Sequence, residues 1–294
     1  MAGLAALPLI GAAPAAARVR VVLLGTKGGP TPSPYRAAPA TLIEIDGKAW
    51  VVDCGNGVAN QLAKAGVALD GLARIFVTHN HSDHIADVGT LIELAWGSGL
   101  KTPVTVHGPP PIRQIVRSQL AALAYDVEAR VREEGRIPLD PLVRVDERAD
   151  PGVVARDGGT TVTSALVDHE TVKPDFAYRF DTSARSIVIS GDTRYSDNLV
   201  ALAKGADLLI HEAVYGPSIP KMAGENAPML ADHLRRSHTL AEEAGLVAAR
   251  AGVKKLVLSH LVPGGPQVTD AMWLAAVRTN FSGEVVIGHD LMEV

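Results

Sequence analysis

The stretch that decides the fold is residues 78–84, which read Thr-His-Asn-His-Ser-Asp-His. Three histidines and one aspartate fall within its last six residues. The apolar run of residues 73–78 predicts a short buried strand, and the spacing of apolar residues in 85–96 predicts a helix. The motif is therefore expected on a turn at the carboxyl end of a strand. Imidazole and carboxylate groups together suit zinc or another borderline divalent ion.

Two neighbouring ion sites are expected within this motif. Alternate side chains of an extended segment share a face, so His79 and His81 can chelate one ion. Asp83 and His84 come after the chain turns, and we expect them to face a second ion. A lone histidine is usually structural or solvated, but four ligand-type residues at this spacing favour a metal site.

The spacing His-x-His-x-Asp-His resembles the signature of the metallo-β-lactamase fold. Strands and helices alternate along the chain, with hairpins in each half, which predicts an α/β protein. The resemblance implies an αββα sandwich, in which two mixed β-sheets pack face to face between helical layers. At 294 residues and 47% hydrophobic the chain can bury a substantial core, and we expect residues 18–294 to form a single hydrolase domain.

The resemblance also implies metal ligands from most of the chain. Each later candidate is expected where a strand runs into a loop, so that all of them converge at one edge of the sandwich. The implied ligands are His79, His81 and His169 for a first zinc ion, Asp83, His84 and His260 for a second, and Asp192 as a bridge. Mn²⁺ and Fe²⁺ are the alternatives to zinc.

A pair of divalent ions roughly 3.5–4 Å apart lowers the pKa of a bridging water and generates hydroxide near neutral pH. Asp83 could both ligate a metal and accept a proton from this hydroxide. Glu212 and His238 resemble the family's Glu–His pair, in which the carboxylate orients an imidazole that acts as an acid or oxyanion donor. A helix-cap or surface histidine is the alternative for His238. His211 is expected either to support a metal ligand or to be structural, and not to bind metal itself.

Residues 53–57, Asp-Cys-Gly-Asn-Gly, follow a predicted strand and resemble the family's first motif. The resemblance implies that Asp53 orients a metal-ligating histidine, and a helix-cap or turn aspartate is the equal alternative. Cys54 is the only cysteine, which excludes an intramolecular disulfide. A small buried residue is preferred for it over a nucleophile. The Gly/Pro-rich residues 26–34 lack the Gly-Lys-Ser/Thr sequence with which a phosphate-binding P-loop ends. Their composition instead predicts a turn or the rim of an active site.

The net charge of −4 and pI of about 6.2 give no global attraction to nucleic acid or anionic membranes. Residues 126–150 hold eight acidic and five basic residues, which also disfavours nucleic acid as a partner. No transmembrane segment is expected. Residues 1–17 are either a signal peptide without its positive region, which predicts a periplasmic or secreted protein, or a flexible tail of a cytoplasmic one. The resemblance implies a homodimer.

These observations predict a dinuclear zinc-dependent hydrolase that uses a metal-bridging hydroxide on small anionic esters, of the aryl sulfate or phosphodiester type. The motifs at 191–194, 211–213 and 238–239 resemble both arylsulfatase-like enzymes and transfer-RNA 3′-processing endonucleases. A lactonase or promiscuous β-lactamase and a transfer-RNA endonuclease are therefore the alternatives. Residues 133–151 and 219–235 are expected to be surface excursions that close over a small-molecule substrate. The intact ligand set disfavours a non-catalytic binding protein.

Overall fold

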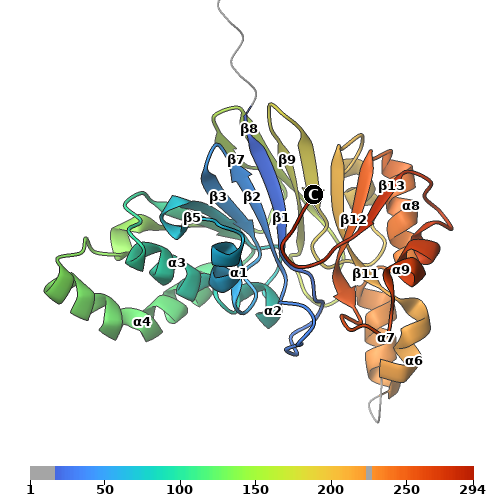
Figure 1. Cartoon of the computed structure of the whole chain (residues 1–294), viewed down its shortest axis with the longest axis horizontal. Helices are drawn as coiled ribbons and strands as arrows, with labels where there is room; N and C mark the ends of the chain where they lie inside the picture. Colours follow the sequence, from blue (N-terminus) through green and yellow to red (C-terminus); the bar gives the residue numbers. More distant parts are fainter. Residues whose placement is uncertain (1–16, 223–226) are drawn as a thin grey trace, which may run out of the picture.

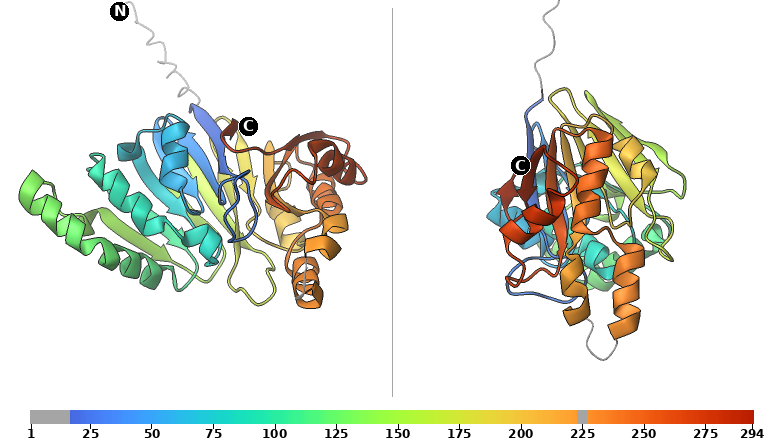
Figure 2. Two further views of the ribbon diagram at one scale, coloured as in Figure 1. Left: turned by 60° about the horizontal axis from the view of Figure 1, so that its bottom comes forward. Right: turned by 90° about the vertical axis from the view of Figure 1, so that its right-hand side faces the viewer.

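The computed structural model describes residues 17–222 and 227–294 (Figure 1). Two seven-stranded sheets pack face to face, and helices cover the outer face of each (Figure 2). The predicted αββα sandwich of two mixed sheets is therefore confirmed. Residues 1–16 of the candidate leader lie outside the described residues. Within these described ranges, every helix is too short or too polar to cross a membrane.

The first sheet gathers the N-terminal half of the chain and its last strand. In spatial order its strands are β14 (Met292–Glu293), β1 (Val19–Gly25), β2 (Ala40–Ile45), β3 (Lys48–Val52), β4 (Leu72–Phe76), β5 (Val104–Gly108) and β6 (Val143–Glu147). Pairing is antiparallel from β14 to β3 and parallel from β3 to β6. The apolar faces of α1 (Val58–Lys64), α3 (Val88–Gly97) and α4 (Ile112–Glu134) cover its outer side.

The second sheet repeats this plan with the C-terminal half. In spatial order its strands are β13 (Glu284–Ile287), β12 (Lys255–Val262), β11 (Leu208–Val214), β10 (Ser186–Ile189), β9 (Phe176–Asp181), β8 (Thr160–Leu166) and β7 (Gly152–Asp157). Pairing is antiparallel from β7 to β10 and parallel from β10 to β13. Its outer face is covered by α5 (Asp197–Leu202), α8 (Ala241–Ala251) and α9 (Asp270–Val277).

Aromatic side chains fill the space between the two sheets. Alternate residues of a strand point to opposite faces, so each strand places one set of side chains here and the other under the helices. The ring of Phe76 on β4 lies 5.2 Å from that of Phe180 on β9, at an interplanar angle of 88°. Tyr178 adds a polar link, because its hydroxyl donates a hydrogen bond of 2.8 Å to the carbonyl oxygen of Val77.

The structure corrects three boundaries predicted from the sequence. The helix expected over 85–96 is divided into α2 (Ser82–Ile85) and α3. The expected excursion 133–151 contains the edge strand β6, whose charged residues obscure a strand pattern, as is common at sheet edges. The second excursion forms α6 (Ile219–Met222) and α7 (Ala227–Ser237), which project together from one end of the sandwich (Figure 1).

Truncation of the inter-sheet core is expected to destabilise the protein strongly. Phe180→Ala removes a fully buried ring from between the sheets, and should lower the free energy of unfolding by about 3–5 kcal/mol. Tyr125→Ala is the matched control, because the Tyr125 side chain on α4 is 86% exposed. Its effect should stay within about 0.5 kcal/mol. Chemical denaturation followed by circular dichroism measures both values, and similar losses would contradict this description of the core.

Candidate metal centre

Strand ends of both sheets bring the candidate ligands to one edge of the sandwich. Residues 78–84 follow β4, His169 follows β8 and Asp192 follows β10. The expected position after a strand is confirmed for these residues. His260 differs, because it lies inside β12 at a bulge in the pairing with β11, with a φ of 45°. A bulge redirects a side chain without ending the strand, which explains why the sequence pattern placed His260 in a loop.

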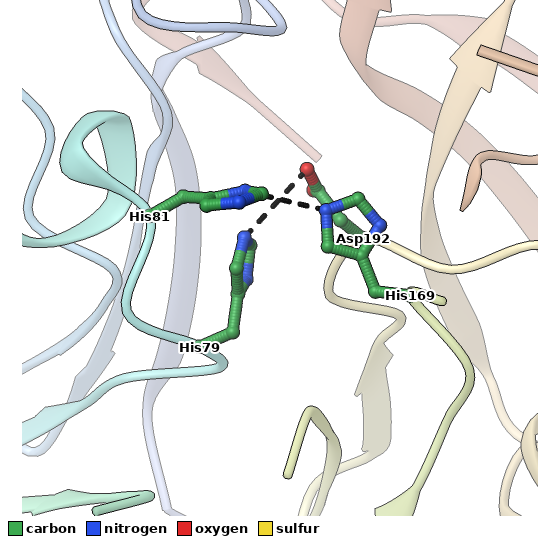
Figure 3. Close-up of side chains that lie close together, drawn as sticks. All are labelled: His79, His81, His169 and Asp192. Carbon is green, nitrogen blue, oxygen red and sulfur yellow. Dashed lines mark hydrogen bonds and ion pairs between the residues drawn. The ribbon is translucent and has the colours of Figure 1, made fainter. Parts of the chain in front are cut away.

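Figure 3 shows the first group of ligand-type side chains. Three imidazoles and one carboxylate, from His79, His81, His169 and Asp192, each contribute one atom to a set within 4.8 Å of one another. Nδ1 of His81 lies 3.3 Å from Nε2 of His169, and Nε2 of His79 lies 3.9 Å from Oδ2 of Asp192. The first half of the chain supplies two of these residues and the second half the other two.

A second group lies beside the first, on the other side of Asp192. Asp83, His84 and His260 form this group, and Oδ2 of Asp83 lies 3.5 Å from Nε2 of both histidines. Oδ2 of Asp192 lies 3.5 Å from Nε2 of His84 and 3.2 Å from Nε2 of His260. The structure thus brings together all seven residues that the sequence analysis selected, with Asp192 between the two groups.

Unpaired nitrogen atoms show that these groups fit divalent metal ions. In the described part of the chain, the buried Nε2 atoms of His79, His84 and His260 have no hydrogen-bond partner. Burial lowers the pKa of His169 to about 4, and it also lowers the pKa of His79, so both rings are neutral near pH 7. A buried neutral imidazole with a free lone pair is a suitable ligand for zinc. Two such groups around one carboxylate suit a dinuclear centre.

Hydrogen bonds from Nδ1 determine which nitrogen of the His84 and His169 rings faces the centre. Nδ1 of His84 lies 2.8 Å from Oδ2 of Asp53, and Nδ1 of His169 lies 2.8 Å from the carbonyl oxygen of Ser237. Each contact uses one ring nitrogen as a donor and leaves Nε2 for a ligand. Asp53 does not cap α1, whose N-cap is Gly57. The structure therefore favours contact with a candidate metal ligand, His84, over a helix cap as the role of Asp53.

Glu212 and His238 form a buried pair at the edge of the second group. Nδ1 of His238 lies 2.9 and 3.0 Å from the two carboxylate oxygens of Glu212. Burial alone would lower the pKa of His238, but the adjacent Glu212 carboxylate outweighs it and raises this pKa to about 9. The helix-cap alternative for His238 is wrong, because α8 begins at Ala241 with Leu240 as its N-cap.

Several contacts of the centre were missed by the sequence analysis. Asp175 is fully buried, and its Oδ2 lies 3.8 Å from Nδ1 of His79. The backbone oxygen of Ser237 carries no sequence signal. The ring of His233 on α7 lies 5.4 Å from that of His238. The sequence analysis did not assign His233 to the centre. Cys54 is buried as expected, and burial raises the pKa of its thiol, which disfavours a nucleophile.

A cavity of about 450 Å³ opens beside the second group. Asp83, Asp192 and His260 form its metal-facing wall, and Met222 of α6 and Leu230 of α7 contribute an apolar wall. The loop containing residues 27–31 forms another side. A substrate in this cavity would contact the candidate ligands directly.

Known proteins share this architecture. The profile of the family described as "Beta-lactamase superfamily domain" matches residues 49–261. Among solved structures, the metallo-β-lactamase fold protein YhfI from Bacillus subtilis superposes with a TM-score of 0.68 at 23% identity, over 94% of this chain and 98% of that one. Human tRNase Z, short form, superposes with a TM-score of 0.67 at 22% identity over 94% of this chain and 98% of that one.

Curated relatives are more similar in sequence. Ribonuclease Z of Mycobacterium bovis (strain BCG / Pasteur 1173P2) is 34% identical over 279 residues, which cover 94% of this chain and 98% of the relative. Ribonuclease Z of Mycobacterium avium (strain 104) is 35% identical with the same coverage. The similarity covers most of this chain and nearly the full length of each relative.

These relatives correct two expectations. The preference for small anionic esters is wrong, because relatives at 34–36% identity carry the name of a ribonuclease. The expectation that nucleic acid is an unlikely partner is wrong for the same reason, since net charge averages the whole surface and does not report the field at one cavity. From its family profile, its relatives and its layered architecture, the chain belongs to the β-lactamase superfamily and has the metallo-β-lactamase fold.

Proposed function

We propose that this protein is a metal-dependent endoribonuclease that processes the 3′ ends of transfer-RNA precursors. The observation that carries this proposal is identity of 34–36% to proteins named ribonuclease Z over 94% of the chain. The convergence of seven ligand-type side chains on one cavity supports it. Residues 18–294 would act as one domain. The protein would work in the compartment that contains precursor transfer RNA.

The proposed metal ligands fall into the two groups of the structure. His79, His81 and His169 would hold one ion, Asp83, His84 and His260 the other, and Asp192 both, with zinc favoured by the imidazole-rich set. Such an ion pair supplies an activated water at neutral pH and stabilises the charge that develops on the phosphate.

The protein's own residues would move the protons. Asp83 borders the cavity, and its carboxylate could accept a proton from the attacking water. His238 would donate a proton to the leaving oxygen as the phosphorus–oxygen bond breaks. Glu212 is the positioning residue, since it holds Nδ1 of His238 and leaves Nε2 for the substrate.

Cleavage of precursor transfer RNA is the direct test. Metal-loaded protein should release the 3′ trailer from a labelled precursor, and a chelator should abolish the reaction because the ligand groups then lose their ions. Mature transfer RNA of the same sequence is the control and should stay intact. A metal-loaded protein that leaves the precursor uncut would contradict the proposed function.

Removal of the shared carboxylate should lower the metal content at both sites. Wild-type protein should contain about two ions per chain. Asp192→Ala should lower the content at both positions, because Oδ2 of Asp192 lies near histidines of each group. Elemental analysis by mass spectrometry measures the content. His289→Ala is the matched control, since this half-exposed histidine pairs with Asp270 outside both groups. Unchanged metal content in Asp192→Ala would refute a bridging role.

The pH dependence should identify the proton donor. His238 acts in its protonated form, so kcat should fall as the pH rises through its pKa, which Glu212 holds above the ordinary value. His238→Ala should lower kcat by about 10²–10⁴-fold and remove this descending limb. Glu212→Gln should shift the limb to lower pH, because it removes the negative charge that stabilises the imidazolium.

Steady-state cleavage of the precursor at a series of pH values gives these profiles. Metal content, measured on the same samples, should remain that of the wild type. An unchanged limb in Glu212→Gln would show that another group donates the proton.

A further inference from the structure

The loop after β1 is fixed to the strand that carries His260. The N–H of Gly28 donates to the carbonyl oxygen of Leu261 at 3.1 Å, and the N–H of Leu261 donates to that of Thr26 at 2.8 Å. A side chain at Gly28 would not fit, because its Cβ would lie 2.8 Å from Nδ1 of His260. The loop backbone therefore lies directly against the candidate metal centre.

Lys27 extends from this loop along the wall of the cavity. Its Nζ donates hydrogen bonds of 2.9 Å to the carbonyl oxygens of Gly28 and Gly29. Its aliphatic part packs against Gly264, where an added Cβ would lie 2.9 Å from Cγ of Lys27. A lysine ammonium has three N–H donors. The two loop carbonyls therefore orient the side chain and leave one donor for another group.

The charge of Lys27 has no partner among the described residues. The side chain is half-buried, and no carboxylate there forms an ion pair with its ammonium. Burial lowers the pKa of Lys27, while the charge of Asp83 opposes this change. Among the cavity-lining residues that the structure describes, Lys27 is the only lysine or arginine. A half-buried cation without a counter-charge is costly, and a bound anion would offset this cost.

We propose that Lys27 holds a non-bridging oxygen of an RNA phosphate in the cavity beside the candidate metal centre. This inference rests on the proposed nuclease function and adds a phosphate subsite to it. The ammonium acts as a fixed point charge that positions the RNA backbone, and it takes no part in proton transfer. The two glycine carbonyls hold the charge in place before RNA binds, which reduces the entropy lost on binding.

Salt dependence of binding is the readout that a purely structural role would not change. Fluorescence anisotropy of labelled precursor transfer RNA, with metal-loaded protein at several salt concentrations, gives the slope of log K against log salt. Lys27→Met should raise Kd several-fold and reduce the magnitude of the slope by about 0.7–0.9, because one phosphate contact is lost. Lys101→Met is the matched control, since this exposed lysine precedes β5, at the strand ends opposite the centre.

Two further variants separate charge from folding. Lys27→Gln keeps N–H donors for the glycine carbonyls but removes the charge, so its slope should match that of Lys27→Met. Lys27→Arg keeps the charge, so its slope should match that of the wild type. If Lys27→Met does not fold, by circular dichroism, these two variants carry the comparison.

Wild-type slopes in both uncharged variants would overturn the subsite, whether or not the protein cleaves the precursor. Failure of the wild type to cleave a precursor that it binds would overturn the nuclease function alone, and the slopes would still decide the role of Lys27. A wild-type protein that neither binds nor cleaves the precursor would overturn both proposals.

Discussion

One buried carboxylate connects the first sheet to the motif at 78–84. Asp53, at the end of β3, accepts hydrogen bonds from the backbone N–H of Thr78 and from Nδ1 of His84. Its φ of 60° is unfavourable for a residue with a side chain, and these bonds offset that strain. The same contacts set the entry angle of the motif and the tautomer of one candidate ligand. Without this carboxylate, buried donors would be unpaired and the turn would lose its anchor.

Local patterns predict the motif at 78–84 and the alternation of strands and helices, whereas the sandwich and the more distant candidate ligands were implied by the family resemblance. The motif at 78–84 is dense, and the periodicity of strands and helices follows from which face is buried. Contacts between distant segments could not be predicted. The bulge at His260 exists only through pairing with β11, and Ser237 meets His169 through its backbone, which any residue could supply. Asp175 contacts His79 only because β9, which follows Asp175, lies beside the motif in the folded chain.

Net charge does not predict nucleic-acid binding here, because it does not show where the charges lie. Much of the acidity of residues 126–150 is neutralised within the segment. Arg130 pairs with both Asp126 and Glu134, and Arg148 pairs with Asp146. These pairs belong to α4 and the edge strand β6, and none of them lines the cavity beside the metal centre. The electrostatic field inside that cavity depends on the few charged groups that line it, among them Asp83, Asp192 and Lys27.

The division of the sheets between the two halves of the chain affects how the protein forms during synthesis. β1 to β6 leave the ribosome before any strand of the second sheet, yet β1 can pair with β14 only after the last residues have emerged. His260 also emerges late, long after the motif at 78–84. The first sheet can therefore be completed only when β14 has been synthesised. The two groups of candidate ligands are therefore completed in succession, the first with Asp192 and the second with His260.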